Sequence, residues 1–292
     1  MKSLERSHPT VTLLYFLAVT LPVMLCMEPL LLCISLAGAL ALLFSRTGGR
    51  NIRTLLYFLA LLLLIALVNP LFQHDGVTVL FFLNGNPVTW EAIAFGLCAG
   101  AMTLAVLCWF LSMSQMMTTD KYLCVFGALS PKLSLMLSMA LRFVPLFTKR
   151  MHAVRLAQRG LGLYRDGTLP DKLRGELRVF SVTVTWALEN GIHTADSMEA
   201  RGYGTGRRTA YAEYDFHAWD GALLALILLM LALTLCGLLT DAVAVTFYPA
   251  LVRAERGVLA ALTYAAYTLL SFLPTLLTVQ EKIKWHFLQS KI

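Results

Sequence analysis

Two short arginine-containing segments have residue types and spacing that suit recognition of an acidic partner. One reads Ala200-Arg201-Gly202, the other reads Gln158-Arg159-Gly160, and each has a further glycine two positions on. Glycines end helices, so we expect each arginine near a helix C-terminus, where the last carbonyl groups favour a cation. The guanidinium donors form a fork that matches a carboxylate. A plain helix cap with a solvated arginine explains one copy as well, and the repetition is what favours docking.

The rest of the chain has the composition of a membrane protein. Of its 292 residues 58% are hydrophobic, and the mean hydropathy is +0.69. Apolar runs near the bilayer-spanning length of about 18 residues recur, and they are continuous rather than alternating, which favours helices. We predict an all-α polytopic membrane protein with about six transmembrane helices, within a range of five to seven. The runs are 11–26, 30–44, 55–72, 90–116, 221–239 and 258–279.

The distribution of Lys and Arg predicts the topology. Cations flank the second and third runs, whereas 73–88 contains no Lys or Arg and carries the turn signal Asn84-Gly85-Asn86-Pro87. The positive-inside rule then places both termini, 45–54 and the segment after Thr118 in the cytosol of a multi-pass cell-membrane protein. It also accounts for the net charge of +7, so nucleic-acid binding is not indicated. Arg253 and Arg256 fall on the outer side, where 241–252 could form a re-entrant or interfacial piece.

A polar insert separates two membrane parts, so we divide the chain into 1–118, 119–220 and 221–292. Between Lys121 and Arg208 there are fourteen Lys and Arg and only six acidic residues. Ser130-Pro131 predicts the start of a helix that ends near Pro145 and is too short to span a bilayer. A second helix over 145–159 and a third over 170–201, with a possible interruption at Gly191, complete the insert.

The insert resembles a known family. Asp196-Ser197-Met198-Glu199-Ala200-Arg201-Gly202-Tyr203, followed by Arg207-Arg208-Thr209, is similar to the signature of the transmembrane (T) component of energy-coupling-factor (ECF) transporters. Leu141-Arg142-Phe143-Val144-Pro145-Leu146 resembles the segment that enters the family's coupling helices. The similarity covers roughly 118–220 well and the outer runs only in general character.

The resemblance implies a scaffold in a vitamin or metal-ion importer. Members of the family hold a substrate-binding S component in the membrane, and their long cytosolic coupling helices dock into grooves of two ABC ATPase subunits. ATP would then bind the partner subunits, and this chain would need no cofactor or metal of its own. The chain also lacks a Gly-rich phosphate loop, which agrees with that expectation.

The family's residues carry over with one ambiguity. Ala200, Arg201 and Gly202 match fully. The family's first motif, Ala-Gln-x-Ala-Arg-Gly, puts Leu161 at the arginine position when it is laid on Ala157-Gln158. The internal repeat instead puts Arg159 there, followed by Gly160, and we prefer Arg159 because a cation suits an acidic groove.

The helices over 132–159 are the expected S-component interface. Their apolar faces are too extensive for open cytosol and their cations too numerous for a lipid core. The residues that we expect at this interface are Leu133, Leu137, Met139, Arg142 and Pro145.

Three other features of the sequence bear on the function. His193, Asp196 and Glu199 could suggest a metal-dependent membrane enzyme acting on a lipid or isoprenoid, but successive members drift by about 60° around a helix and would converge poorly. A transporter that carries its own solute is disfavoured by the scarcity of charges inside the runs. Glu28, next to Pro29, is expected at an interfacial hairpin turn.

Overall fold

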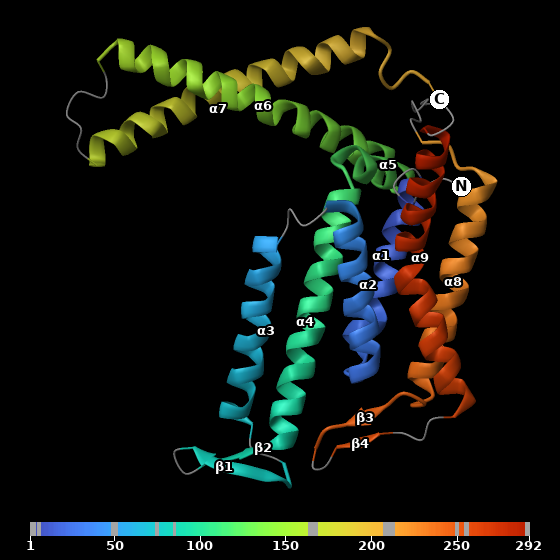
Figure 1. The fold of residues 1–292 in the computed structure, drawn as a ribbon. Helices are drawn as coiled ribbons and strands as arrows, with labels where there is room; N and C mark the ends of the chain where they lie inside the picture. Colours follow the sequence, from blue (N-terminus) through green and yellow to red (C-terminus); the bar gives the residue numbers. More distant parts are fainter. Residues whose placement is uncertain are drawn as a thin grey trace. The chain divides into compact units, whose positions relative to one another are not determined.

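The chain folds into helices and two small hairpins (Figure 1). The computed structural model describes residues 4, 7–47, 52–73, 76–83, 86–162, 169–206, 214–248, 251–253 and 257–289. Over these residues there are nine α-helices, so the predicted helical fold class is confirmed. The chain divides into two compact units, one made of Met1–Tyr122 with Tyr214–Ile292 and the other of Leu123–Glu213.

The first unit holds the apolar helices. Each predicted apolar run corresponds to one of them; most ends shift by a few residues, but the last helix continues ten residues beyond the predicted end, to Gln289. Five contain a segment long and apolar enough to cross a membrane, and α1, with 17 residues, is apolar but shorter. The helices are α1 (Pro9–Leu25), α2 (Pro29–Thr47), α3 (Ile52–Phe72), α4 (Trp90–Met116), α8 (Ala218–Leu239) and α9 (Val258–Gln289).

Glu28 has a structural role at the start of α2. Its side chain is buried, and Oε2 accepts a hydrogen bond from the backbone N–H of Leu31 at 2.7 Å. A carboxylate in this place satisfies one of the unpaired N–H groups of the first turn and complements the helix dipole. The acid beside Pro29 therefore caps a helix.

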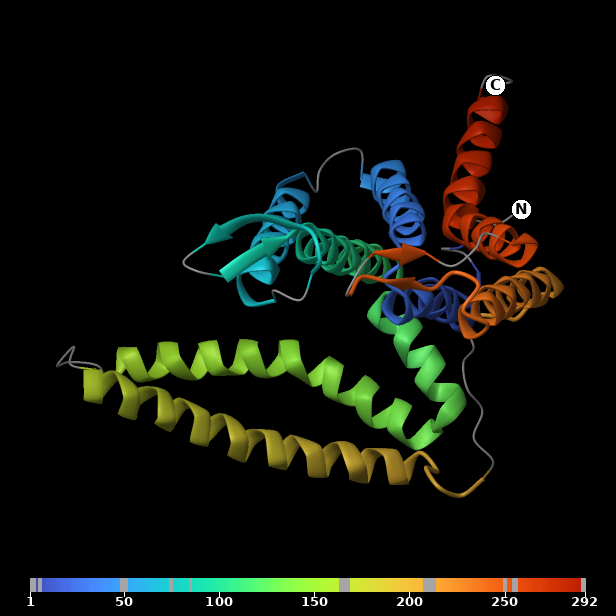
Figure 2. The same ribbon diagram turned by 90° about the horizontal axis from the view of Figure 1, so that it is seen from below.

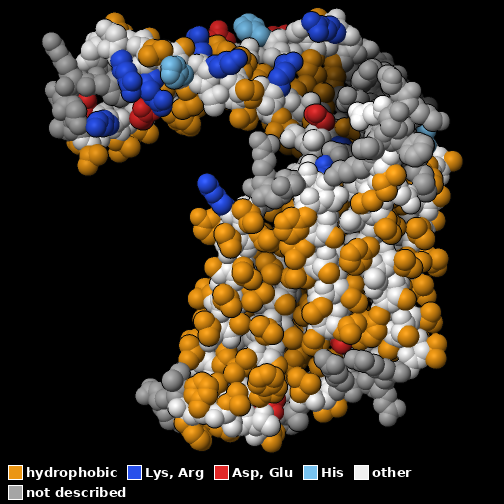
Figure 3. Space-filling model, viewed as in Figure 1, with side chains coloured by type: hydrophobic (Ala, Val, Ile, Leu, Met, Phe, Trp, Pro, Cys, Tyr) orange, Lys and Arg blue, Asp and Glu red, His pale blue; other side chains and the backbone are white. Residues whose placement is uncertain are grey.

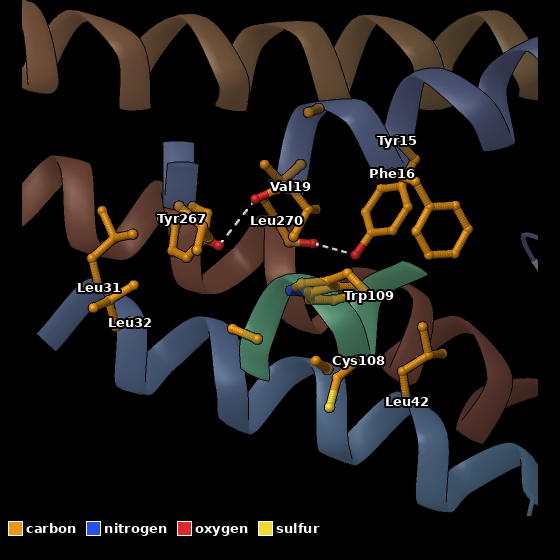
Figure 4. Close-up of a cluster of buried hydrophobic side chains, with 14 of the residues drawn as sticks. Tyr15, Phe16, Val19, Leu31, Leu32, Leu42, Cys108, Trp109, Tyr267 and Leu270 are labelled. Carbon is orange, nitrogen blue, oxygen red and sulfur yellow. Dashed lines mark hydrogen bonds between the residues drawn. The ribbon is translucent and has the colours of Figure 1, made fainter. Parts of the chain in front are cut away.

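Aromatic side chains join α1, α2, α4 and α9 at the centre of this unit (Figure 4). Tyr15 in α1 donates its hydroxyl hydrogen to the carbonyl of Leu270 at 3.1 Å, and Tyr267 in α9 donates to the carbonyl of Val19 at 3.1 Å. The indole N–H of Trp109 donates to a serine hydroxyl of α2 at 2.9 Å. Buried polar groups of these aromatic residues are thus paired, as an apolar interior requires.

Helix α3 packs on α4 and touches one strand of the first hairpin. A side chain at Gly96 or Gly100 of α4 would place its Cβ 3.0 Å from the carbonyl oxygen of Ala66 or 2.9 Å from that of Leu62. The two glycines form a G-x-x-x-G pair that lets the backbones approach closely. Only 6% of the membrane-crossing segment of α3 is buried, so its apolar side chains mostly face outward.

The two hairpins lie between spans. Strands β1 (Val79–Leu83) and β2 (Asn86–Thr89) pair antiparallel between α3 and α4, and β3 (Val245–Thr246) pairs with β4 (Val252–Arg253) between α8 and α9. The first had been predicted only as a loop with a turn, and its Asn84-Gly85 lies outside the described residues. The second includes most of 241–252, for which a re-entrant or interfacial piece is the prediction; the pairing of β3 with β4 gives this segment a local structure.

The second unit is a pair of long helices that run in opposite directions and cross (Figures 1 and 2). Helix α5 (Thr119–Leu129), which was not predicted, carries the chain into it, and α6 (Pro131–Gly160) and α7 (Leu169–Ala200) follow. The predicted break at Pro145 is wrong, because α6 continues through this proline, and α7 is also uninterrupted at Gly191. Stacking of Phe143 on Phe147 and packing of Phe147 against Trp186 of α7 hold both sides of the proline in one helix.

We expect Gly100→Val to separate α3 from α4, because the new side chain would meet the backbone of Leu62, which cannot move aside as a side chain can. Overpacking of this kind costs about 1–3 kcal/mol. In detergent, a thiol-reactive dye should label the buried Cys98 and Cys108 of α4 at a lower temperature than in the wild type. Gly221→Ala is the control, since its Cβ would make only ordinary contact at 3.6 Å. Identical labelling curves for Gly100→Val and the wild type would contradict the close approach.

Candidate functional site

The C-terminus of α7 presents the first arginine segment in a fixed conformation. The N–H of Tyr203 donates to the carbonyl of Met198 at 3.0 Å, and the N–H of Gly202 donates to that of Glu199 at 2.9 Å. This pair of bonds defines a Schellman cap, and Gly202 has the left-handed φ of +86° that the cap requires. Arg201 is the exposed cap residue, so its guanidinium projects from a helix end that is well defined.

The C-terminus of α6 has a related cap in a different register from the one we preferred. The left-handed residue is Gly162, with φ of +73°, and its N–H donates to the carbonyl of Arg159 at 3.0 Å. Leu161 is the cap residue, whereas Gly160 still belongs to the helix. By position in the cap, Leu161 is therefore the counterpart of Arg201, and Arg159 lies two residues earlier on the last turn. Leu161 is 78% exposed.

The residues expected at an apolar interface on α6 do not share one face. Leu133 and Leu137 are exposed and lie four residues apart on one side, a side that Leu141 and Val144 extend. Pro145 follows Leu141 by four residues and lies about 40° from it, at the edge of this side. Met139, which is partly buried, and Arg142 lie at least 100° around the helix from Leu133, Leu137 and Leu141.

Helix α7 carries a second apolar stripe that the sequence analysis missed. Its members recur every three or four residues, the spacing of one helical face, and all are exposed. They are Leu173, Leu177, Phe180, Val184 and Leu188. The spacing of three and four residues is present in the sequence, but charged residues lie between the apolar ones and mask the pattern. An exposed apolar surface of this length marks an interaction site.

The two helices are joined by a bidentate ion pair and a small buried seam. Arg155 of α6 donates to Glu176 of α7 through Nε at 2.9 Å and through a terminal nitrogen at 2.6 Å. Gln158, Val179 and Thr183 are buried nearby along the pair. A two-point guanidinium–carboxylate contact fixes orientation as well as distance, so the two helices are held in a defined register.

The side chains considered for a metal site are exposed along α7. His193, Asp196 and Glu199 point into open surroundings. Across the described residues, no three His, Cys, Asp or Glu side chains are grouped so that they could hold a metal ion.

These features define a multi-pass helical membrane protein with a separate unit of two long helices. The family model described as "CbiQ: Cobalt transport protein" matches residues 1–211, and the chain belongs to this family. The expected resemblance to the transmembrane component of ECF transporters is thereby confirmed, and the chain is a transporter component rather than an enzyme.

Three relatives carry the same description, "Energy-coupling factor transporter transmembrane protein EcfT". The chain is 27% identical over 226 residues to that of Bacillus selenitireducens, which covers 70% of this chain and 81% of the relative. It is 27% identical over 177 residues to that of Lactobacillus helveticus (53% and 64%). It is 33% identical over 91 residues to that of Macrococcus caseolyticus (30% and 34%).

Proposed function

We propose that this chain transmits ATP-driven motion from two ABC ATPase subunits to a substrate-binding S component in the membrane. It would thereby drive import of a micronutrient, a vitamin or a metal ion. The observation that carries this proposal is Arg201, held at the end of α7 by a Schellman cap in a chain similar to EcfT. Binding and hydrolysis of ATP belong to the partner subunits in this scheme, and solute recognition belongs to the S component.

The two helix ends are proposed to dock ATPase grooves of different chemistry. The cap of α7 offers the guanidinium of Arg201 to a carboxylate. The cap of α6 offers the apolar side chain of Leu161 at the equivalent position, with Arg159 one half-turn earlier. An exposed leucine is stabilised by an apolar contact and an arginine by an acidic one, so the two grooves need not be alike.

The apolar stripe of α7 is proposed to contact the S component, together with Leu133 and Leu137 on α6. Surfaces of this kind are costly in water and are normally covered by a partner. The S component is itself a membrane protein, so an apolar face suits it. Of the other residues expected in this interface, Pro145 lies at its edge, whereas Met139 and Arg142 lie at least 100° around the helix from the leucines.

The proposed topology follows the charges. We place the unit of α6 and α7 and both termini on the cytosolic side of the cell membrane, with 73–88 outside. The insert 119–220 is then one functional part in the cytosol, and lipid surrounds the membrane parts 1–118 and 221–292. No nucleic-acid partner is part of this proposal.

Arg201→Ala is expected to weaken assembly or to uncouple ATP hydrolysis from uptake while leaving the membrane fold intact. Removal of one partner of a desolvated charge pair costs about 2–5 kcal/mol. Co-purification of ATPase subunits with the chain and uptake by the assembled complex would both be measured. Arg201→Lys should recover only part of the loss, because the fork is absent. Wild-type uptake by Arg201→Ala would rule out the proposed docking role.

The other helix end allows a direct comparison of Leu161→Ala with Arg159→Ala. Because Leu161 holds the cap position, its truncation should lower transport more than that of Arg159. Fully burying a leucine contributes about 1.5–3 kcal/mol, which sets the size of the expected loss. The opposite order would show that the preferred sequence register, with Arg159 as the docking residue, is correct despite the cap geometry.

Leu177→Glu should block capture of the S component while the ATPase subunits stay bound, because an unpaired carboxylate would be buried in an apolar interface. Val182→Glu is the matched control, since Val182 is also an exposed apolar residue but lies about 140° around the helix from Leu177 and about 160° from Val184. Pull-downs of both partner types from the same preparation would be compared. Loss of the ATPases with retention of the S component would mean that the two interfaces are assigned the wrong way round.

A further inference from the structure

Helix α6 carries a basic surface that the two helix ends and the apolar stripes do not use. Over its 30 residues it has six Lys and Arg and no Asp or Glu. Arg155 forms an ion pair with Glu176. Arg142, Lys149 and Arg150 are exposed, and none of them forms an ion pair with a carboxylate in the part of the chain that the structure describes. We call these three residues the basic face of α6; Figure 3 shows Lys and Arg side chains gathered over this two-helix unit.

Aromatic rings hold the two arginines of the basic face in place. The Arg142 guanidinium lies 5.6 Å from the centre of the Phe143 ring, and that of Arg150 lies 5.2 Å from the centre of the Trp186 ring. Phe147 connects them, stacked on Phe143 at 5.5 Å and edge-to-face with Trp186 at 6.0 Å. A guanidinium held over a ring keeps its N–H edge available for an anionic partner and loses less entropy on binding.

The basic face points away from the apolar stripe of the same helix. At 3.6 residues per turn, Arg142 and Arg150 each lie at least 100° around the helix from Leu133, Leu137 and Leu141, whereas Lys149 lies about 80° from Leu141. A partner centred on the stripe therefore leaves the two arginines uncovered. If the stripe meets a membrane-embedded S component, the cations face the aqueous side, which favours an acidic protein surface over lipid headgroups.

We propose that the basic face of α6 is a second recognition surface for the ATPase partner, which meets an acidic patch outside the grooves that receive the helix ends. The inference rests on the proposed coupling function. It assigns the basic face to the first association with the ATPase partner, whereas the helix ends hold the docked complex. Exposed charges act over a distance and chiefly raise the association rate, whereas a desolvated contact such as that of Arg201 governs dissociation.

The ATPase subunits are obtained by co-purification with the chain. The test measures the rate at which they associate with the full chain in nanodiscs, at low and at high salt. The variant Arg142→Gln/Lys149→Gln/Arg150→Gln should associate about tenfold more slowly at low salt, with a weaker salt dependence and a nearly unchanged dissociation rate. Arg142→Lys/Arg150→Lys keeps the charge and should behave like the wild type. Arg201→Ala should instead dissociate faster.

Four outcomes would overturn the proposal. If the triple variant associates like the wild type while Arg201→Ala still weakens binding, the basic face has no such role and the coupling function stands. If neither variant matters, the coupling function fails as well. Equal loss in the lysine variant would point to ring packing rather than charge. A difference seen only in nanodiscs that contain phosphatidylglycerol, and not in phosphatidylcholine alone, would assign the cations to lipid headgroups.

Discussion

In a bilayer core no water is present to accept or donate a hydrogen bond, so the protein itself must satisfy its polar groups. The membrane helices satisfy their own backbone groups, and several hydroxyls, such as those of Thr20 and Ser112, donate to carbonyls of their own helix. The hydroxyls of Tyr15 and Tyr267 reach backbone carbonyls of α9 and α1, one in each direction. The same constraint explains the buried carboxylate of Glu28, which is paired with the first turn of α2.

The two-helix unit has the opposite character. Its ends are capped and its crossing is fixed by Arg155 and Glu176, yet its outer surfaces are left without cover over the described residues. Each helix has an exposed apolar stripe, which is unfavourable in water. The basic face of α6 attracts opposite charge. A rigid element with several different unsatisfied faces is suited to connect partners of different chemistry.

The sequence predicts this architecture well where one physical signal dominates. Continuous apolar runs located the membrane helices to within a few residues, because burial in lipid requires both the length and the composition. The break at Pro145 was wrong because a local preference competes with aromatic packing on both sides of the proline, which no local pattern reveals. The register at the end of α6 was also open, since Gly160 and Gly162 can each adopt a left-handed conformation and only the fold selects Gly162.

Helix α6 has one mechanical property that follows from Pro145. Proline has no N–H, so the carbonyl four residues earlier receives no helical hydrogen bond, and the helix is least resistant to bending at that point. Pro145 lies between the apolar stripe at 133–144 and the cap at Leu161. A bend at this point changes the direction of the apolar stripe relative to the cap and leaves the hydrogen bonds of each half of the helix intact.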